Sequence, residues 1–169
     1  MVEVHLKRKN EFNSYNWCSA NGDDVSLSQI IETCKIFIPQ GSRIFIGSDS
    51  FATSTKINFA TVICVYGRGI ISRYFFAKQY VEKNRYRNLA SRITEEVRRS
   101  IELAELLKRD YMISPSNIEL HLDVSSKKAK NGTSKYSDML KGYVAGAGFS
   151  CKIKPNAWCS QTIADRHSK

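Results

Sequence analysis

An aspartate at the end of an apolar run constrains this chain more than any other feature. Residues 43–50 read RIFIGSDS, in which three bulky apolar residues precede Gly47, Ser48 and Asp49. Bulky β-branched and aromatic residues in such a run predict a buried central strand. A carboxylate that closes a buried strand is costly unless it is paired with a cation or binds a metal ion. Asp49 is therefore a candidate functional residue.

The same arrangement occurs a second time, in the C-terminal half of the chain. Residues 118–124 read IELHLDV, so apolar residues alternate along a predicted strand and Asp123 closes it. Two acid-terminated strands in one small domain indicate a metal site at a shared edge of a sheet. The alternative is that each aspartate caps the turn after its strand, a role that aspartate fills well.

The remaining pattern predicts an α/β domain with an N-terminal extension. Residues 1–24 are polar and predict an irregular segment, and Ser26 and Gln29 have the spacing of a helix capping box. The first three strands are expected to be joined by hairpins. The chain length fits one domain, which we place at residues 25–169. Apolar periodicity predicts helices at about 26–38, 88–109, 134–146 and 158–168, and strands at about 43–50, 56–66, 70–77, 118–124 and 149–154.

This order of elements resembles the ribonuclease H-like fold, and short motifs resemble its YkuK-like branch of predicted bacterial and phage nucleases. The matching motifs are Ile46 to Ser50, Arg92-Ile93 with Glu96-Val97, His121 to Asp123, Gly142 to Val144 with Gly148-Phe149, Lys154-Pro155 and Ala164-Asp165. The resemblance implies a mixed five-stranded sheet flanked by helices, with three antiparallel strands and then two parallel additions. It also implies that the first and fourth strands lie side by side and parallel, which would bring Asp49 and Asp123 together.

The resemblance further implies four carboxylates that hold two divalent metal ions, supplied by the first strand, the first long helix, the fourth strand and the last helix. Asp49 and Asp123 match the strand positions, and Asp165 matches the last helix, although it could instead pair with Lys169 on the helix surface. Hard oxygen ligands favour Mg²⁺ or Mn²⁺. We therefore expect both the catalytic residues and the metal ligands to be Asp49, Glu96, Asp123 and Asp165.

Two adjacent glutamates compete for the position on the long helix. Glu96 lies at the edge of the apolar stripe, one turn before the small Ser100, which would leave room for an ion. Glu95 lies on a more polar face, within pairing distance of Arg92 and Arg99. A metal ligand has to face the sheet, so we choose Glu96. The alternative is that both glutamates are solvated residues of the helix surface.

The charge of the chain indicates a polyanionic partner. A total of 26 lysines and arginines against 16 acids gives a formal net charge of +10. This balance favours nucleic acid, whether RNA, DNA or a hybrid, although a generic basic surface is the alternative. The expected contacts are Lys127, Lys128 and Lys130 in the loop after the Asp123 strand, and Arg85 and Arg87 in a cluster interleaved with tyrosines.

The chain shows neither an apolar run of membrane-spanning length nor the apolar core of a signal peptide. Its five cysteines are widely spaced and form no Cys-x-x-Cys pair, so we expect a reducing cytoplasm. Taken together, the sequence predicts a metal-dependent nuclease that hydrolyses phosphodiester bonds by a two-metal carboxylate mechanism. The alternatives are a non-catalytic nucleic-acid-binding module of the same fold and a protein-assembly subunit.

Overall fold

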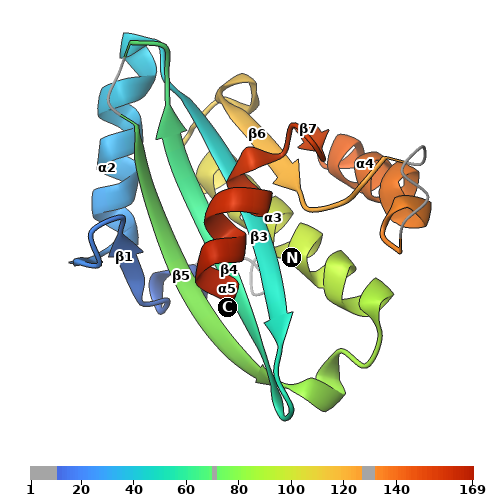
Figure 1. The fold of residues 1–169 in the computed structure, drawn as a ribbon. Helices are drawn as coiled ribbons and strands as arrows, with labels where there is room; N and C mark the ends of the chain where they lie inside the picture. Colours follow the sequence, from blue (N-terminus) through green and yellow to red (C-terminus); the bar gives the residue numbers. More distant parts are fainter. Residues whose placement is uncertain (1–10, 70–71, 127–131) are drawn as a thin grey trace.

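A seven-stranded mixed sheet forms the centre of the structure, a computed structural model that describes residues 11–69, 72–126 and 132–169 (Figure 1). The strands lie in the order β2-β1-β5-β4-β3-β6-β7. Strands β3, β4 and β5 form the predicted antiparallel meander, and β6 and β7 extend it in parallel. The strands are β1 (Trp17–Ser19), β2 (Asp24–Val25), β3 (Arg43–Ala52), β4 (Lys56–Tyr66), β5 (Arg73–Glu82), β6 (Ile118–Leu122) and β7 (Ser150–Ile153).

The parallel pairing of β3 with β6, which the family resemblance implied, is confirmed. A parallel pair cannot be joined by a tight hairpin, so the chain must cross over the sheet between such strands. It leaves β5, passes through α3 (Leu89–Asp110) and returns beside β3 as β6. A second crossover through α4 (Ser137–Gly146) places β7 beside β6.

Capping residues in the sequence set where helices α2 and α3 begin. Ser26 caps α2 (Leu27–Phe37) with the predicted capping box, because its Oγ accepts from the Gln29 backbone N–H at 3.2 Å and its own N–H donates to Gln29 Oε1 at 2.8 Å. Asn88 caps α3 by accepting from the Ser91 backbone N–H at 2.8 Å. In the described ranges, no helix has the length and hydrophobicity of a transmembrane span.

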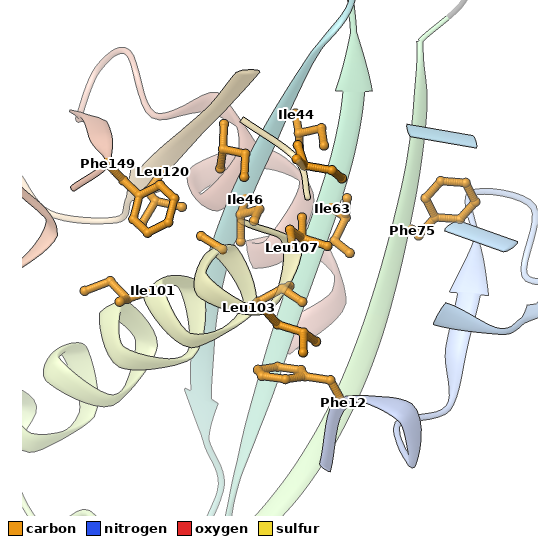
Figure 2. Packing of buried hydrophobic residues seen from close by; sticks show 14 of the residues in the cluster. Phe12, Ile44, Ile46, Ile63, Phe75, Ile101, Leu103, Leu107, Leu120 and Phe149 are labelled. Carbon is orange, nitrogen blue, oxygen red and sulfur yellow. The ribbon is translucent and has the colours of Figure 1, made fainter. Parts of the chain in front are cut away.

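The main apolar core lies between these helices and one face of the sheet. Figure 2 shows Ile101, Leu103 and Leu107 of α3 in one apolar cluster with Ile44 and Ile46 of β3, and Leu107 lies beside Ile46. All five side chains are almost inaccessible to solvent. Full burial of an aliphatic side chain contributes about 1.5–3 kcal/mol. This contact therefore fixes α3 firmly against β3.

A C-terminal helical segment covers the opposite face of the sheet (Figure 1). It consists of a π-helical stretch, η6 (Cys159–Ala164), followed by α5 (Asp165–Ser168). Phe45 of β3 and Val62 of β4 pack against it. Gly47 permits its close approach, because a Cβ at this position would lie 2.8 Å from the backbone nitrogen of Ser160. The glycine of the acid-terminated strand thus sets the distance between β3 and the C-terminal segment.

The sheet has two strands more than the five predicted, and both come from the N-terminal part of the chain. The prediction of an irregular segment does not hold for Trp17–Ser19, where Trp17 is buried and pairs with Ala77 of β5. Strands of two and three residues are too short to show an alternating pattern. β5 also runs later than predicted, to Glu82, because it pairs with β4 along almost its whole length. The start of the domain at residue 25 stays a prediction.

We predict that Gly47→Ala destabilises the protein by about 1–3 kcal/mol, because the added methyl group forces the C-terminal segment away from β3. Gly142→Ala is the matched control. An added Cβ at Gly142, within α4, meets no atom within 4 Å, so this change should be neutral or stabilising by up to about 1 kcal/mol. Urea unfolding of both variants measures the difference. Equal stability of the two variants would contradict the close contact.

Candidate functional site

The register between β3 and β6 brings Asp49 and Asp123 to neighbouring positions. Ser48 lies opposite Leu122 in the parallel pair, and the two aspartates are the next residues along each chain. Side chains alternate along a strand, so Asp49 points to one face of the sheet, and Ser48 and Ser50 point to the other. The face to which Asp49 points is the one covered by the C-terminal segment. Asp49 is only 7% exposed.

Glu96 reaches the same place from α3, on the other side of the sheet. Its Oε1 accepts a hydrogen bond of 2.6 Å from the Oγ of Ser50, the residue after Asp49 on β3. Ser50 points toward α3 and Asp49 points toward the C-terminal segment, because neighbours on a strand alternate. The two carboxylates therefore approach one another around β3, and both line one cavity.

The C-terminal segment contributes a fourth carboxylate and a hydrogen bond to the first. Asp165 begins α5 and is half-buried. Later in α5, Ser168 Oγ donates to Asp49 Oδ2 at 2.7 Å. Ser168 is anchored in turn by Asn58 of β4, whose Nδ2 donates to its carbonyl oxygen at 2.5 Å. The orientation of Asp49 is therefore fixed by α5.

All four carboxylates predicted from the sequence line one cavity of about 210 Å³. Burial, together with the negative charges of Asp123 and Asp165, raises the pKa of Asp49 to about 6, although the hydrogen bond from Ser168 opposes this shift. Burial and the charge of Asp49 raise the pKa of Glu96 well above its ordinary value. Carboxylates gathered in a poorly solvated site disfavour one another's ionisation. A bound cation would relieve this repulsion.

Two lysines accompany the other two carboxylates. Lys154 Nζ lies 2.7 Å from Asp123 Oδ1, and Lys169 Nζ lies 2.8 Å from Asp165 Oδ2. The second contact is the helix-surface pair that the sequence left open. In residues 11–69, 72–126 and 132–169, no three His, Cys, Asp or Glu side chains are gathered closely enough to hold a metal ion as they stand. The four carboxylates share a cavity without forming a ready-made cage.

The chemistry of this donor set suits a hard divalent cation. Mg²⁺ and Mn²⁺ prefer carboxylate and other oxygen ligands, and this cavity is lined by four carboxylates from separate parts of the chain. Burial raises the pKa of Asp49 and of Glu96, the neighbouring carboxylates add to both shifts, and a bound cation would favour the ionised forms. The residues present therefore fit the metal that the sequence predicted.

Comparison with known proteins identifies the family. The family model described as Ribonuclease H-like matches residues 27–169. The chain belongs to the ribonuclease H-like family. A comparison with curated proteins found no match.

Glu95, the other glutamate considered for the helix position in this ribonuclease H-like chain, lines a different cavity from Glu96. Its oxygens accept from Arg98 Nε at 2.6 Å and from Arg99 Nε at 2.8 Å. The interpretation of Glu95 as a solvated surface residue is wrong, because it is buried beneath Arg99, whose guanidinium lies 4.2 Å from the centre of the Phe59 ring. Ion pairing lowers the pKa of Glu95, against the effect of burial.

Ser100 does not leave room for an ion. Its side chain is fully buried, and its Oγ donates to Ser48 Oγ at 3.2 Å. Ser48 Oγ donates in turn to Thr61 Oγ1 at 3.1 Å. This chain of hydroxyl groups links α3 to β3 and β4 beneath the carboxylates. Space for an ion exists in the cavity beside Glu96, and Ser100 does not line that cavity.

The predicted nucleic-acid contacts lie outside the carboxylate cavity or outside the described residues. Arg85, in the short helix η2 (Lys83–Arg85), and Arg87 are both exposed. Arg85 lines the cavity of Glu95. Lys127, Lys128 and Lys130 fall outside the residues that the structure describes. Their proposed role is therefore argued only from charge and from their place in the chain after Asp123.

Sequence reasoning missed the residues that support the four acids. Ser168 orients Asp49, Lys154 contacts Asp123, and Arg92 lines the cavity one helical turn before Glu96. Lys154 and Arg92 belong to the short motifs that carry the family resemblance, which was the only signal available for them. Ser168 gives no signal, since its role depends on α5 lying against β3.

We predict that Asp49→Asn stabilises the metal-free protein at neutral pH and not at acid pH. Because the folded-state pKa of Asp49 is raised from 3.8 to about 6, ionisation in this interval costs the folded state more than the unfolded state. The stability advantage of the variant should therefore be absent below about pH 4 and reach about 3 kcal/mol above about pH 6. Asn keeps an acceptor for Ser168. Urea unfolding without divalent cations, with the two proteins compared at each pH, would refute this if their difference did not change.

Proposed function

We propose that this ribonuclease H-like chain is a metal-dependent nuclease that hydrolyses phosphodiester bonds of nucleic acid. The observation that carries the proposal is that four carboxylates, from β3, α3, the end of β6 and α5, line one cavity. No packing requirement brings four acids together, because each adds to the repulsion felt by the others. Their gathering is explained if a cationic ligand and a polyanionic substrate meet there.

The ligands proposed for Mg²⁺ or Mn²⁺ are Asp49, Glu96, Asp123 and Asp165. In the two-metal mechanism that we propose, one bound ion would activate water for attack on phosphorus and the other would stabilise the leaving oxygen. The role of the chain is to hold the ligands in place. Ser50 orients Glu96 and Ser168 orients Asp49 through hydrogen bonds of 2.6 and 2.7 Å. Lys154 and Lys169 supply positive charge at the mouth of the same cavity.

The partner that we propose is RNA, DNA or a hybrid, because the net charge of +10 favours a polyanion. Arg85, Arg87 and the three lysines at 127, 128 and 130 are the proposed contacts. We also propose membership of the YkuK-like branch, one domain over residues 25–169, and a cytoplasmic location. The last rests on the five cysteines, all of which are free thiols.

Cleavage assays with Mg²⁺ or Mn²⁺ over single-stranded, duplex, hybrid and junction substrates test the activity. We expect Glu96→Gln to lower turnover by more than the roughly 100-fold that loss of an outer-shell partner costs. The matched control is Glu95→Gln, which should retain turnover and instead lose about 3–5 kcal/mol of stability, because it breaks buried ion pairs. The assays should be run well below the unfolding temperature. Loss of activity in Glu95→Gln alone would reverse our assignment of the helix acid.

Metal-dependent cleavage separates the enzyme from its two alternatives, and salt-dependent binding separates those two alternatives from each other. Each phosphate contact adds about 0.9 for duplex DNA, or about 0.7 for single strands, to the slope of log affinity against log salt. Replacing Lys127, Lys128 and Lys130 with Ala should therefore reduce the slope by about 2–3. Binding without cleavage at any divalent cation would favour the non-catalytic module. Absence of binding at low salt would favour the assembly subunit.

A further inference from the structure

The rim of the carboxylate cavity carries an exposed aromatic ring. Phe51 is 44% exposed and lines the cavity together with Leu89, which is 39% exposed. Neither of the two apolar clusters formed by the described residues includes Phe51. Single exposed apolar residues are common on proteins, but these two stand at the mouth of a cavity lined by four acids. Such a position offers an apolar surface to whatever enters.

The strand geometry places Phe51 beside the proposed reaction centre. Phe51 follows Asp49 by two residues on β3, so the two side chains lie on the same face of the sheet. Phe51 pairs with Asn58 near the end of the β3–β4 ladder. Both strands continue to be hydrogen-bonded at this point, so the backbone that carries the ring is fixed by the sheet. Phe51 is therefore a rigid platform adjacent to Asp49.

Arg92 adds a positive charge to the same rim. It lies one helical turn before Glu96 on α3 and lines the cavity. Its Nε is buried, and within the described part of the chain this atom has no hydrogen-bond partner. A buried guanidinium donor without a partner is costly, and phosphate oxygens are among its best acceptors. Arg92 as a whole is partly exposed and lines the cavity, so its guanidinium is placed to bind a phosphate group that enters there.

We propose that Phe51 and Arg92 form a nucleotide subsite, in which a base stacks on Phe51 and a neighbouring phosphate binds Arg92. This inference rests on the proposed function and names its substrate more closely. A base can offer its face to a side chain only when it is unpaired or at a strand end. The subsite therefore selects single-stranded nucleic acid, or a strand end, over the interior of a duplex.

Equilibrium binding of a single-stranded oligothymidylate and of an abasic oligonucleotide of equal length, both in EDTA, tests the subsite without requiring catalysis. Phe51→Ala should weaken binding of the oligothymidylate by about 5- to 150-fold and leave binding of the abasic strand unchanged. Phe51→Trp, which keeps an aromatic ring at this position, should bind the oligothymidylate as the parent protein does. The matched control is Tyr143→Ala on α4, since Tyr143 is also 44% exposed, and it should have no effect. Arg92→Gln should weaken the binding of both strands and reduce the slope of log affinity against log salt concentration by about 0.7.

Equal effects of Phe51→Ala on the two strands, or no effect on either, would overturn the proposal. A change confined to self-association of the protein would also overturn it, because it would make the rim a protein contact. These outcomes are independent of the nuclease proposal. If the subsite binds bases but no cation supports cleavage, the proposed catalysis fails while the subsite stands. If cleavage occurs and Phe51→Ala leaves the preference for the oligothymidylate over the abasic strand unchanged, the subsite proposal is wrong while the nuclease proposal stands.

Discussion

The carboxylate cavity depends first on the hydrogen bonds between β3 and β6. This parallel ladder sets Asp49 beside Asp123, and a slip of one residue would turn one strand's side chains to the opposite face. The ladder is held from both sides, because Ile46 packs with α3 and Phe45 packs with the C-terminal segment. A strand buried on both faces has a strongly specified register. The apolar core thus positions the charged groups at the ends of these strands.

The four carboxylates are held in two different ways, which bears on how a cation would enter. Asp49 and Glu96 are buried and receive hydrogen bonds from serine hydroxyls that are themselves fixed by the fold. Asp123 and Asp165 contact the partly exposed lysines Lys154 and Lys169. Exposed ion pairs contribute only about 0–1 kcal/mol, so these lysines can leave at small cost. A cation would therefore meet two fixed ligands and two that are readily released.

The sequence predicted the elements that depend on local pattern and on the family resemblance. The meander and the two strands closed by aspartate follow from the local pattern, whereas the parallel pair and the set of four acids that share the cavity follow from the family resemblance. Three features were not accessible. β1 and β2 are too short to carry a period. Glu95 is buried and pairs with Arg99, which itself packs over Phe59, a contact between elements far apart in sequence. Ser168 acquires its role only when α5 lies against β3.

A crystal structure grown with Mn²⁺, with anomalous scattering measured at the manganese edge, tests the central claim that these carboxylates form one divalent metal site. The account predicts an anomalous peak inside the cavity, in contact with Asp49, together with movement of Lys154 away from Asp123. Absence of a peak in the cavity at millimolar Mn²⁺, with Lys154 still in contact with Asp123, would contradict it. The cavity would then be a charge network whose negative groups are balanced by lysines alone.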